Sequence, residues 1–147
     1  MKLYNTLTSK EEEFIPANGM NVNMYVCGVT PYSSTHVGHA LSYIVFDVLR
    51  RYLEYQGYLV RHVQNFTDVD DKIIQRSLDE GISGDDLVQR YMNDFFTTMD
   101  ALNVQRASVY PRATQEIPRI VETIEKLIEK GFAYPAAGDV YFRVTKS

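Results

Sequence analysis

The sequence predicts an α/β fold with a parallel sheet, and three consecutive segments predict it. An apolar run at 22–29 is typical of a buried strand, residues from about 37 to 56 carry apolar side chains at helical spacing, and 58–64 again has the character of a strand. A strand–helix–strand unit of this length almost always crosses over right-handedly and pairs its strands in parallel. We therefore expect the 147 residues to form one domain with a hydrophobic core.

The ends of these first elements follow from the residues that bound them. The strand Val22–Val29 ends at Thr30-Pro31, because proline cannot continue a strand ladder. The loop Thr30–Thr35 then leads into a helix over about Val37–Gln56, for which Gly57 is a natural stop. The apolar residues at helical spacing in this segment are Leu41, Ile44, Val45, Val48, Leu49 and Tyr52.

Two further helices are indicated by their capping patterns. The segments Thr67–Asp70 and Ser83–Asp86 both have the spacing of a capping box, so Thr67 and Ser83 are the expected caps. The first pattern precedes a short helix that Gly81 closes. The second precedes an amphipathic helix. Its apolar residues are Leu87, Tyr91, Phe95, Met99 and Leu102.

The two ends of the sequence complete the expected elements. Thr114 is placed to cap a third long helix that ends at Gly131. The tail Phe132–Val144 alternates around Ala137-Gly138-Asp139, which predicts a hairpin. The apolar residues of the helix that Thr114 caps are Ile117, Ile120, Val121, Ile124 and Leu127.

Near the start of the sequence, Lys10–Glu13 is a short charged stretch that we expect to be a solvated loop or an edge.

The composition limits the classes of protein to which the chain can belong. Hydrophobic residues make up 45% and charged residues 23%, as in soluble globular domains. No apolar run has membrane-spanning length and no leader is visible, so we expect a cytoplasmic protein without a membrane partner. The single cysteine excludes an internal disulfide. A net charge of −4 argues mildly against strong nucleic-acid binding by this segment alone.

The segment His36-Val37-Gly38-His39 lies where a strand feeds the start of a helix. Unpaired N–H groups at a helix start bind phosphate oxygens, and Gly38 would let phosphates approach the backbone closely. His36 and His39 would lie on one face of the first turn and point at the same ligand. Four-residue matches arise by chance, but the surrounding strand–helix–strand context favours nucleotide binding over a structural role. We predict that this turn binds ATP.

Cys27 lies near the end of the first strand and has two interpretations. It is either a buried small hydrophobic residue or a thiolate ligand for zinc. Three or four ligands are needed, and the sequence has no second cysteine, although His36, His39 and His62 are available in principle. From spacing alone, the structural interpretation is the better one.

An acidic cluster follows the second strand. Asp68, Asp70 and Asp71 offer carboxylates of the kind that hold magnesium beside substrate phosphates. Acidic residues also compensate the dipole at a helix start. We favour this second role for Asp70 and Asp71, and leave Asp68 open.

Four motifs together resemble the cysteinyl-tRNA synthetases, a family of class I aminoacyl-tRNA synthetases. They are Met24-Tyr25-Val26-Cys27-Gly28, His36-Val37-Gly38-His39, Asn65-Phe66-Thr67-Asp68-Val69-Asp70-Asp71-Lys72 and Pro111-Arg112-Ala113-Thr114. The resemblance runs in order from Leu3 to Val144, nearly the whole chain. It implies a Rossmann-like fold, the first half of a class I nucleotide-binding domain.

The resemblance also implies roles for individual residues. Val29–His39 matches the signature segment whose histidines stabilise ATP while its α-phosphate is attacked by the amino acid's carboxylate, so His36 and His39 are the expected catalytic residues. With Gly38 they are also the expected ATP-binding residues. Fixed donors that are already in place lower such a barrier without reorganisation.

A second set of implied roles concerns the amino acid. Cys27 matches a ligand of the family's Zn²⁺, which binds the substrate thiolate, and this reverses the structural interpretation of Cys27. Metal–sulfur bonding explains how cysteine is selected over serine. Gly28 and Thr67 match positions that contact the bound cysteine.

Several features of the family are absent from this sequence. Family members are roughly three times longer than this chain. Missing are the second half of the nucleotide-binding fold, the later zinc ligands (a cysteine, a histidine and a glutamate), the K-M-S-K-S loop and the helical region that reads the anticodon. We therefore expect an N-terminal piece of the enzyme, with residues 1–115 as the first half of the catalytic domain. Residues 116–147 would be a helix and hairpin at the start of the connecting insertion.

The expected function is that of the catalytic part of a cysteine–tRNA ligase. It activates L-cysteine with ATP, accompanied by Mg²⁺, to cysteinyl-adenylate and transfers the cysteinyl group to tRNA(Cys). With one zinc ligand, the piece alone should bind zinc weakly or not at all, and should be inactive. Two alternatives stay open: the cysteine–sugar ligase of mycothiol synthesis, which shares the activation step, and a folded, non-catalytic nucleotide-binding module.

Overall fold

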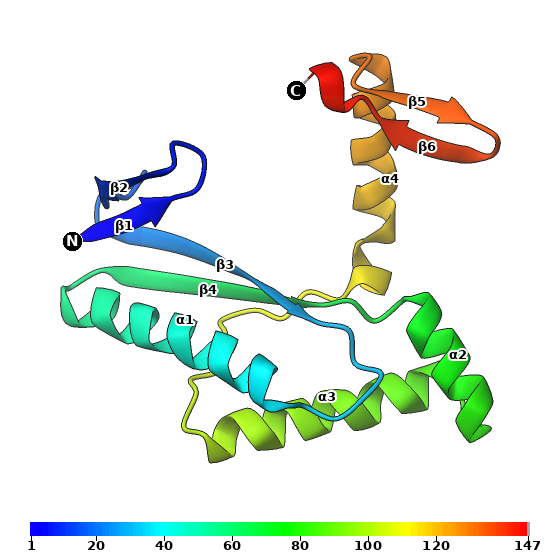
Figure 1. Cartoon of the computed structure of the whole chain (residues 1–147), viewed down its shortest axis with the longest axis horizontal. Helices are drawn as coiled ribbons and strands as arrows, with labels where there is room; N and C mark the ends of the chain where they lie inside the picture. Colours follow the sequence, from blue (N-terminus) through cyan, green and yellow to red (C-terminus); the bar gives the residue numbers. More distant parts are fainter. Residues whose placement is uncertain (147) are drawn as a thin grey trace.

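A computed structural model of the chain describes residues 1–146 (Figure 1). A parallel strand pair lies at its centre, with two helices on one side, a small hairpin near the N-terminus and a helix with a second hairpin projecting from one end. The elements are β1 (Lys2–Asn5), β2 (Lys10–Glu13), β3 (Asn21–Val29), α1 (Val37–Tyr55), β4 (Leu59–Phe66), α2 (Asp71–Glu80), α3 (Gly84–Ala101), α4 (Ala113–Glu129), β5 (Ala133–Ala136), β6 (Asp139–Phe142) and the 3₁₀ turn η1 (Val144–Lys146).

The central strands β3 and β4 pair in parallel, with α1 as the crossover between them. This confirms the predicted α/β fold class. The register shifts between Val26 and Val29, so the strand is irregular just before it ends. Val109 and Arg112 make parallel bridges to the other edge of β4, whereas no strand of the described residues pairs with the outer edge of β3.

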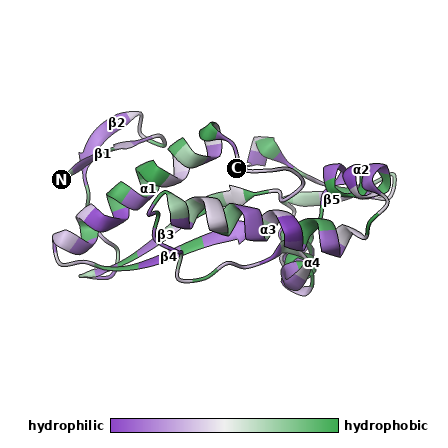
Figure 2. Ribbon diagram, turned by 90° about the horizontal axis from the view of Figure 1, so that it is seen from below, coloured by the Kyte–Doolittle hydropathy of each residue, from purple (hydrophilic) through white to green (hydrophobic). Residues whose placement is uncertain are grey.

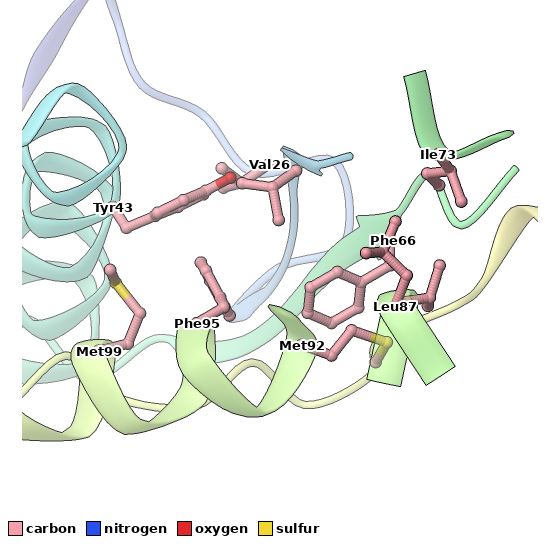
Figure 3. Close-up of a cluster of buried hydrophobic side chains, with 10 residues drawn as sticks. Val26, Tyr43, Phe66, Ile73, Leu87, Met92, Phe95 and Met99 are labelled. Carbon is pink, nitrogen blue, oxygen red and sulfur yellow. The ribbon is translucent and has the colours of Figure 1, made fainter. Parts of the chain in front are cut away.

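The core fills the space between the strand pair, α1 and α3 (Figure 3). Phe66, at the end of β4, is fully buried, and its ring meets that of Phe95 on α3 edge-on with 5.5 Å between centroids. Edge-to-face pairs of this kind add to the free energy gained by burying the rings. The core therefore anchors the carboxyl end of β4, where the motif residues begin. Its buried members are Val26, Val29, Tyr43, Phe66, Ile73, Leu87, Val88, Met92, Phe95 and Met99.

The apolar face predicted for α1 is mostly exposed. Leu41, Val45 and Val48 each keep more than half of their surface accessible, and hydrophobic residues are visible along α1 in Figure 2. The buried residues of α1 are Tyr43, Asp47 and Leu53. The helical period of this stripe was therefore correctly predicted, but no other element of residues 1–146 covers it.

Several helix ends agree with the prediction, whereas the start of α2 corrects it. Gly57 follows α1 with a φ of +91°, and Ser83 caps α3 by accepting the N–H of Asp86. Thr67 does not cap α2. Asp70 does, because the chain remains extended beyond β4 and its helical turn begins three residues later.

The third long helix, α4, also begins differently from the prediction. Its cap position is Arg112, and Thr114 lies inside the helix instead of capping it. No residue of α4 is fully buried, and β5 of the C-terminal hairpin packs against it. Lys10–Glu13 forms β2, an edge strand paired antiparallel with β1. None of the helices in residues 1–146 is both long enough and apolar enough to cross a bilayer.

Candidate functional site

The motif residues gather where β3 and β4 end and α1 begins. β3 ends at Val29 and β4 at Phe66, and the chain after β3 runs through a short loop into α1 (Figure 1). In open α/β sheets, ligands bind outside the carboxyl ends of the strands. The predicted site therefore lies at the end of the sheet where this fold class binds ligands.

His36 and His39 lie together at the start of α1. Their rings are stacked, with centroids 3.8 Å apart and an interplanar angle of 17°. His36 is the N-cap of the helix, and its extended backbone places the ring over the first turn. The two imidazoles thus lie side by side at the N-terminus of α1.

The backbone donors of this turn are not free, contrary to the prediction. The Nδ1 atom of His36 accepts the N–H groups of Gly38 at 3.2 Å and His39 at 3.4 Å. A side chain at residue 38 would approach the His36 ring at 3.1 Å, so Gly38 gives room to this ring. A phosphate could use these two donors only after the His36 ring turns away from them.

His39 has an electrostatic environment that favours its neutral form. Burial lowers the pKa of His39, and the neighbouring His36 lowers it further. The Nδ1 atom of His39 is buried and has no hydrogen-bond partner among the described residues. A neutral imidazole carries one N–H, and because Nδ1 is buried, only Nε2 of His39 is left to hydrogen-bond a ligand at this turn.

Cys27 lies on the exposed side of β3, and its backbone is tied to α1. Val26 and Val29 on either side of the irregular segment are buried, whereas Cys27 is exposed, with its Sγ 3.8 Å from the carbonyl oxygen of Gly28. The hydroxyl of Tyr43 on α1 donates to the Cys27 carbonyl at 3.3 Å. Burial, followed by the nearby Cys27, raises the pKa of Tyr43 to about 12, so its proton stays in place.

Gly28 and Thr67 are brought together by a residue that we did not predict. Asn65 accepts the Gly28 N–H at 2.8 Å and donates to the Thr67 hydroxyl oxygen at 3.2 Å. A Cβ atom at residue 28 would lie 1.5 Å from the carbonyl oxygen of Asn65. The two strand ends are therefore too close for any side chain at Gly28.

The three residues of the acidic cluster lie at or bind the N-termini of helices. Asp70 accepts the Lys72 N–H at 2.9 Å as the cap of α2, and Asp71 lies in the first turn, in line with their predicted dipole role. Asp68 instead holds α4, because its two oxygens accept the N–H of Thr114 at 2.9 Å and the hydroxyl of Thr114 at 2.6 Å. The carboxylate that the sequence left open thus has a structural partner.

Cys27 is the one predicted metal ligand of the chain, and its thiol is accessible. Within residues 1–146 there is no group of three or more His, Cys, Asp or Glu side chains that could hold a metal ion. His62, a potential ligand by sequence, is buried and paired in register with Met24, well before the end of β3. Cys27 therefore fits as a single thiolate ligand, and these residues do not complete a site.

The sequence interpretation missed two polar residues that organise this region. Asn65 and Tyr43 bind backbone groups at the strand end. Asn65 stood inside a quoted motif, which was the available signal. Tyr43 was not distinguishable from an ordinary helix residue.

A cavity of about 630 Å³ lies away from these residues, at the amino ends of the strands. It is lined by Asn21–Asn23, Glu54 and Gly57–Arg61. None of the candidate site residues lines it. Because the motifs and the rule for parallel sheets both indicate the carboxyl ends, we assign the candidate site there.

Sequence comparisons identify proteins similar to the chain. The family model described as tRNA synthetases class I (C) catalytic domain matches residues 13–147. A cysteine–tRNA ligase of Dehalococcoides mccartyi is 56% identical over 99% of this chain, which covers 32% of that relative. A cysteine–tRNA ligase of Clostridioides difficile is 53% identical over 99% of this chain and 31% of the relative. The chain thus spans about a third of the length of the curated relatives it matches.

Structural comparison gives a consistent result. Mycobacterium tuberculosis methionyl-tRNA synthetase, solved in complex with methionyl-adenylate, matches with a TM-score of 0.68 and 25% identity. The match covers 76% of this chain and 23% of the synthetase. The fold is accordingly that of part of a class I synthetase.

Proposed function

Because the chain belongs to the family of class I (C) tRNA synthetase catalytic domains, we propose that it supplies the activation site of a cysteine–tRNA ligase. In this proposal ATP and L-cysteine react to give cysteinyl-adenylate, and the cysteinyl group then passes to tRNA(Cys). The observation that carries it is the 56% identity to a cysteine–tRNA ligase over 99% of the chain. The reaction is proposed to take place in the cytoplasm.

The histidine turn is the part of the site that acts on ATP. The attack of the cysteine carboxylate on the α-phosphate adds negative charge to the phosphate, and hydrogen-bond donors already in place stabilise it. His39 suits this role because its neutral ring keeps one N–H that can donate to a phosphate oxygen. His36 contributes once its ring leaves the N–H groups of Gly38 and His39, which frees these donors for phosphate.

The strand ends are the part of the site that holds cysteine. Gly28 and Thr67 are proposed to contact the amino acid, and Cys27 to lie beside its side chain. Their closeness, fixed through Asn65, supports this assignment. ATP is proposed to enter with Mg²⁺.

Zinc enters the proposal through one residue. Cys27 would provide one thiolate ligand, and the other ligands would come from outside residues 1–147. When bound, zinc supplies a direct bond to the substrate thiolate, which discriminates cysteine from serine.

The division of the chain is likewise a proposal. Residues 1–115 would form the first half of the catalytic domain, and residues 116–147 would begin the connecting insertion. The boundary falls within the first turn of α4, whose C-terminal end carries the β5–β6 hairpin.

Amino-acid-dependent exchange of pyrophosphate into ATP tests the proposed function. The protein encoded by the whole reading frame that contains these residues is assayed with each of the twenty amino acids. We expect cysteine to support exchange and the other amino acids to give background. His39→Ala should lower kcat at least about tenfold with little change in the KM for ATP, since the lost hydrogen bond stabilises the transition state.

The acceptor then decides between the remaining functions. Transfer of the cysteinyl group to tRNA supports the proposal, and transfer to an amino sugar would show the cysteine–sugar ligase instead. Exchange with a different amino acid, or an unchanged kcat in His39→Ala, would contradict the assigned site.

A further inference from the structure

The side chain of Asn65 joins three groups at the ends of β3 and β4. Its Oδ1 atom accepts the N–H of Gly28 at 2.8 Å and the hydroxyl of Tyr25 at 2.9 Å. Its Nδ2 atom donates to the Thr67 hydroxyl oxygen at 3.2 Å. Asn65 therefore connects both residues that are proposed to contact the amino acid.

The orientation of this amide is determined by the chemistry of its partners. A backbone N–H can only donate, so the atom of Asn65 that faces Gly28 must be the oxygen. The nitrogen then necessarily faces Thr67. An exchange of the two amide atoms would place two donors against each other at Gly28, which is unfavourable.

The contact with Asn65 fixes Gly28 and occupies its backbone N–H. The Gly28 N–H is already bonded to Asn65, and the backbone of Asn65 leaves no room for a Cβ atom at residue 28. The Gly28 N–H is therefore not available to a ligand while the Asn65 side chain accepts it.

Thr67 is held by two independent bonds. Its backbone N–H donates to the carbonyl oxygen of Val29 at 3.0 Å, which continues the pairing beyond the strands. Its hydroxyl oxygen accepts from Asn65, so the hydroxyl proton is directed away from Asn65. A hydroxyl that otherwise rotates freely is then limited in the directions in which it can donate.

We infer that Asn65 is a positioning residue for the amino-acid subsite, acting through the hydroxyl of Thr67. Its amide orients this hydroxyl toward the bound amino acid and holds Gly28 beside it. This inference rests on the proposed function, because it concerns the same subsite. It adds a residue that touches neither the amino acid nor ATP.

The test measures pyrophosphate exchange in the protein encoded by the whole reading frame. Asn65→Asp keeps the acceptor for Gly28 and Tyr25 and replaces the N–H donor that faces Thr67. Thr67→Val removes the hydroxyl. Each should raise the KM for cysteine about tenfold, the usual effect of losing one hydrogen bond to a ligand, and leave the KM for ATP unchanged.

The double variant, Asn65→Asp with Thr67→Val, distinguishes a positioning role of Asn65 from a general contribution to stability. If Asn65 acts through the Thr67 hydroxyl, Asn65→Asp should have no further effect in the Thr67→Val background. Thr67→Ser keeps a hydroxyl and should restore a KM for cysteine near that of the wild type. Tyr25→Phe is the matched control, because it removes another bond to the Asn65 oxygen and leaves the bond to Thr67 intact.

Each contrary result refutes a defined statement. Additive effects of the two substitutions, or an equal rise in the KM for ATP, would overturn the positioning role. If the wild type activates a different amino acid, the proposed function is wrong, and the same variants assayed with that amino acid still decide the role of Asn65. Absence of exchange with every amino acid would refute both.

Discussion

Gly28 shows how a single residue determines the geometry of the site. The backbones of β3 and β4 approach so closely there that a Cβ atom would lie 1.5 Å from the carbonyl oxygen of Asn65. The adjacent Cys27 and the nearby Thr67 take their positions from this approach. The glycine is required because of space, since its φ is not in the left-handed region.

Gly28→Ala should therefore destabilise the protein strongly. The strands must separate to admit the methyl group, which breaks the bond from the residue 28 N–H to Asn65. We expect the free energy of unfolding in urea to fall by at least about 3 kcal/mol. Gly84→Ala is the control, because the nearest atom to its added methyl group is 3.8 Å away and its stability should be nearly unchanged. Equal stabilities of the two variants would contradict the described strand approach.

His62 makes stability depend on pH. Burial lowers its pKa from the ordinary value of 6.5, the nearby Arg50 lowers it further, and Asp47 opposes the shift. As the pH falls below about 6.5, the unfolded chain binds a proton at His62 that the folded protein does not bind. The contribution of His62 to the free energy of unfolding is therefore fully present above this pH and is lost progressively below it.

The variant His62→Leu isolates this effect. It removes two ring nitrogens that lack partners among the described residues, so it should not destabilise the protein at pH 7.5. Between pH 7.5 and pH 5.5, the free energy of unfolding should fall less in this variant than in the wild type. His39, whose pKa is also lowered, remains in both proteins. Identical pH profiles would refute the assignment to His62.

At the scale of elements, local periodicity was sufficient for the strand–helix–strand unit and insufficient for two helix starts. The order β3–α1–β4 follows from apolar spacing and from stops such as Gly57. The cap predicted at Thr67 fails because its N–H continues the pairing with Val29. Contacts between elements, which a local pattern does not contain, decide such positions.

The start of α4 is likewise fixed from another element. Asp68, which follows β4, accepts both the N–H and the hydroxyl of Thr114. This contact links two motifs that lie 46 residues apart in the sequence. It explains why Thr114 is inside the helix although its sequence environment is typical of a cap.

Loss of this contact should be measurable as a loss of stability. We expect Thr114→Val and Asp68→Ala each to cost about 1 kcal/mol, as for the loss of a helix cap, and the double variant to cost less than the sum. Thr123→Val is the control on the same helix, because the Thr123 hydroxyl donates to the Arg119 carbonyl of its own helix, one turn earlier. Additive losses in urea denaturation would show that Asp68 and Thr114 act independently.

At the scale of the whole molecule, the sequence predicted that the candidate site residues lie near the carboxyl ends of the strands, but it did not predict their contacts. The histidine pair was predicted because a strand that leads into a helix start places such residues at the carboxyl end of the strand, whereas Cys27 was identified as a candidate ligand only through the family resemblance. The prediction of free N–H groups was wrong because the His36 ring occupies them. Such side-chain contacts depend on rotamers that the sequence pattern does not specify.

Two surfaces of the protein are left uncovered by residues 1–146. The stripe of α1 around Leu41, Val45 and Val48 is exposed, and the outer edge of β3 has no partner strand among residues 1–146. The helical period predicted an apolar face correctly, but whether that face is buried depends on what packs against it. The family relatives, which are about three times as long, contain further chain.

Hydrogen–deuterium exchange with a non-hydrolysable analogue of cysteinyl-adenylate tests the central claim most directly. The protein of the whole reading frame is compared with and without the analogue. The adenylate site at the carboxyl ends of β3 and β4 predicts slower exchange in residues 27–40 and 64–68. Slower exchange confined to residues 21–23 and 57–61, around the cavity at the opposite ends of the strands, would contradict it.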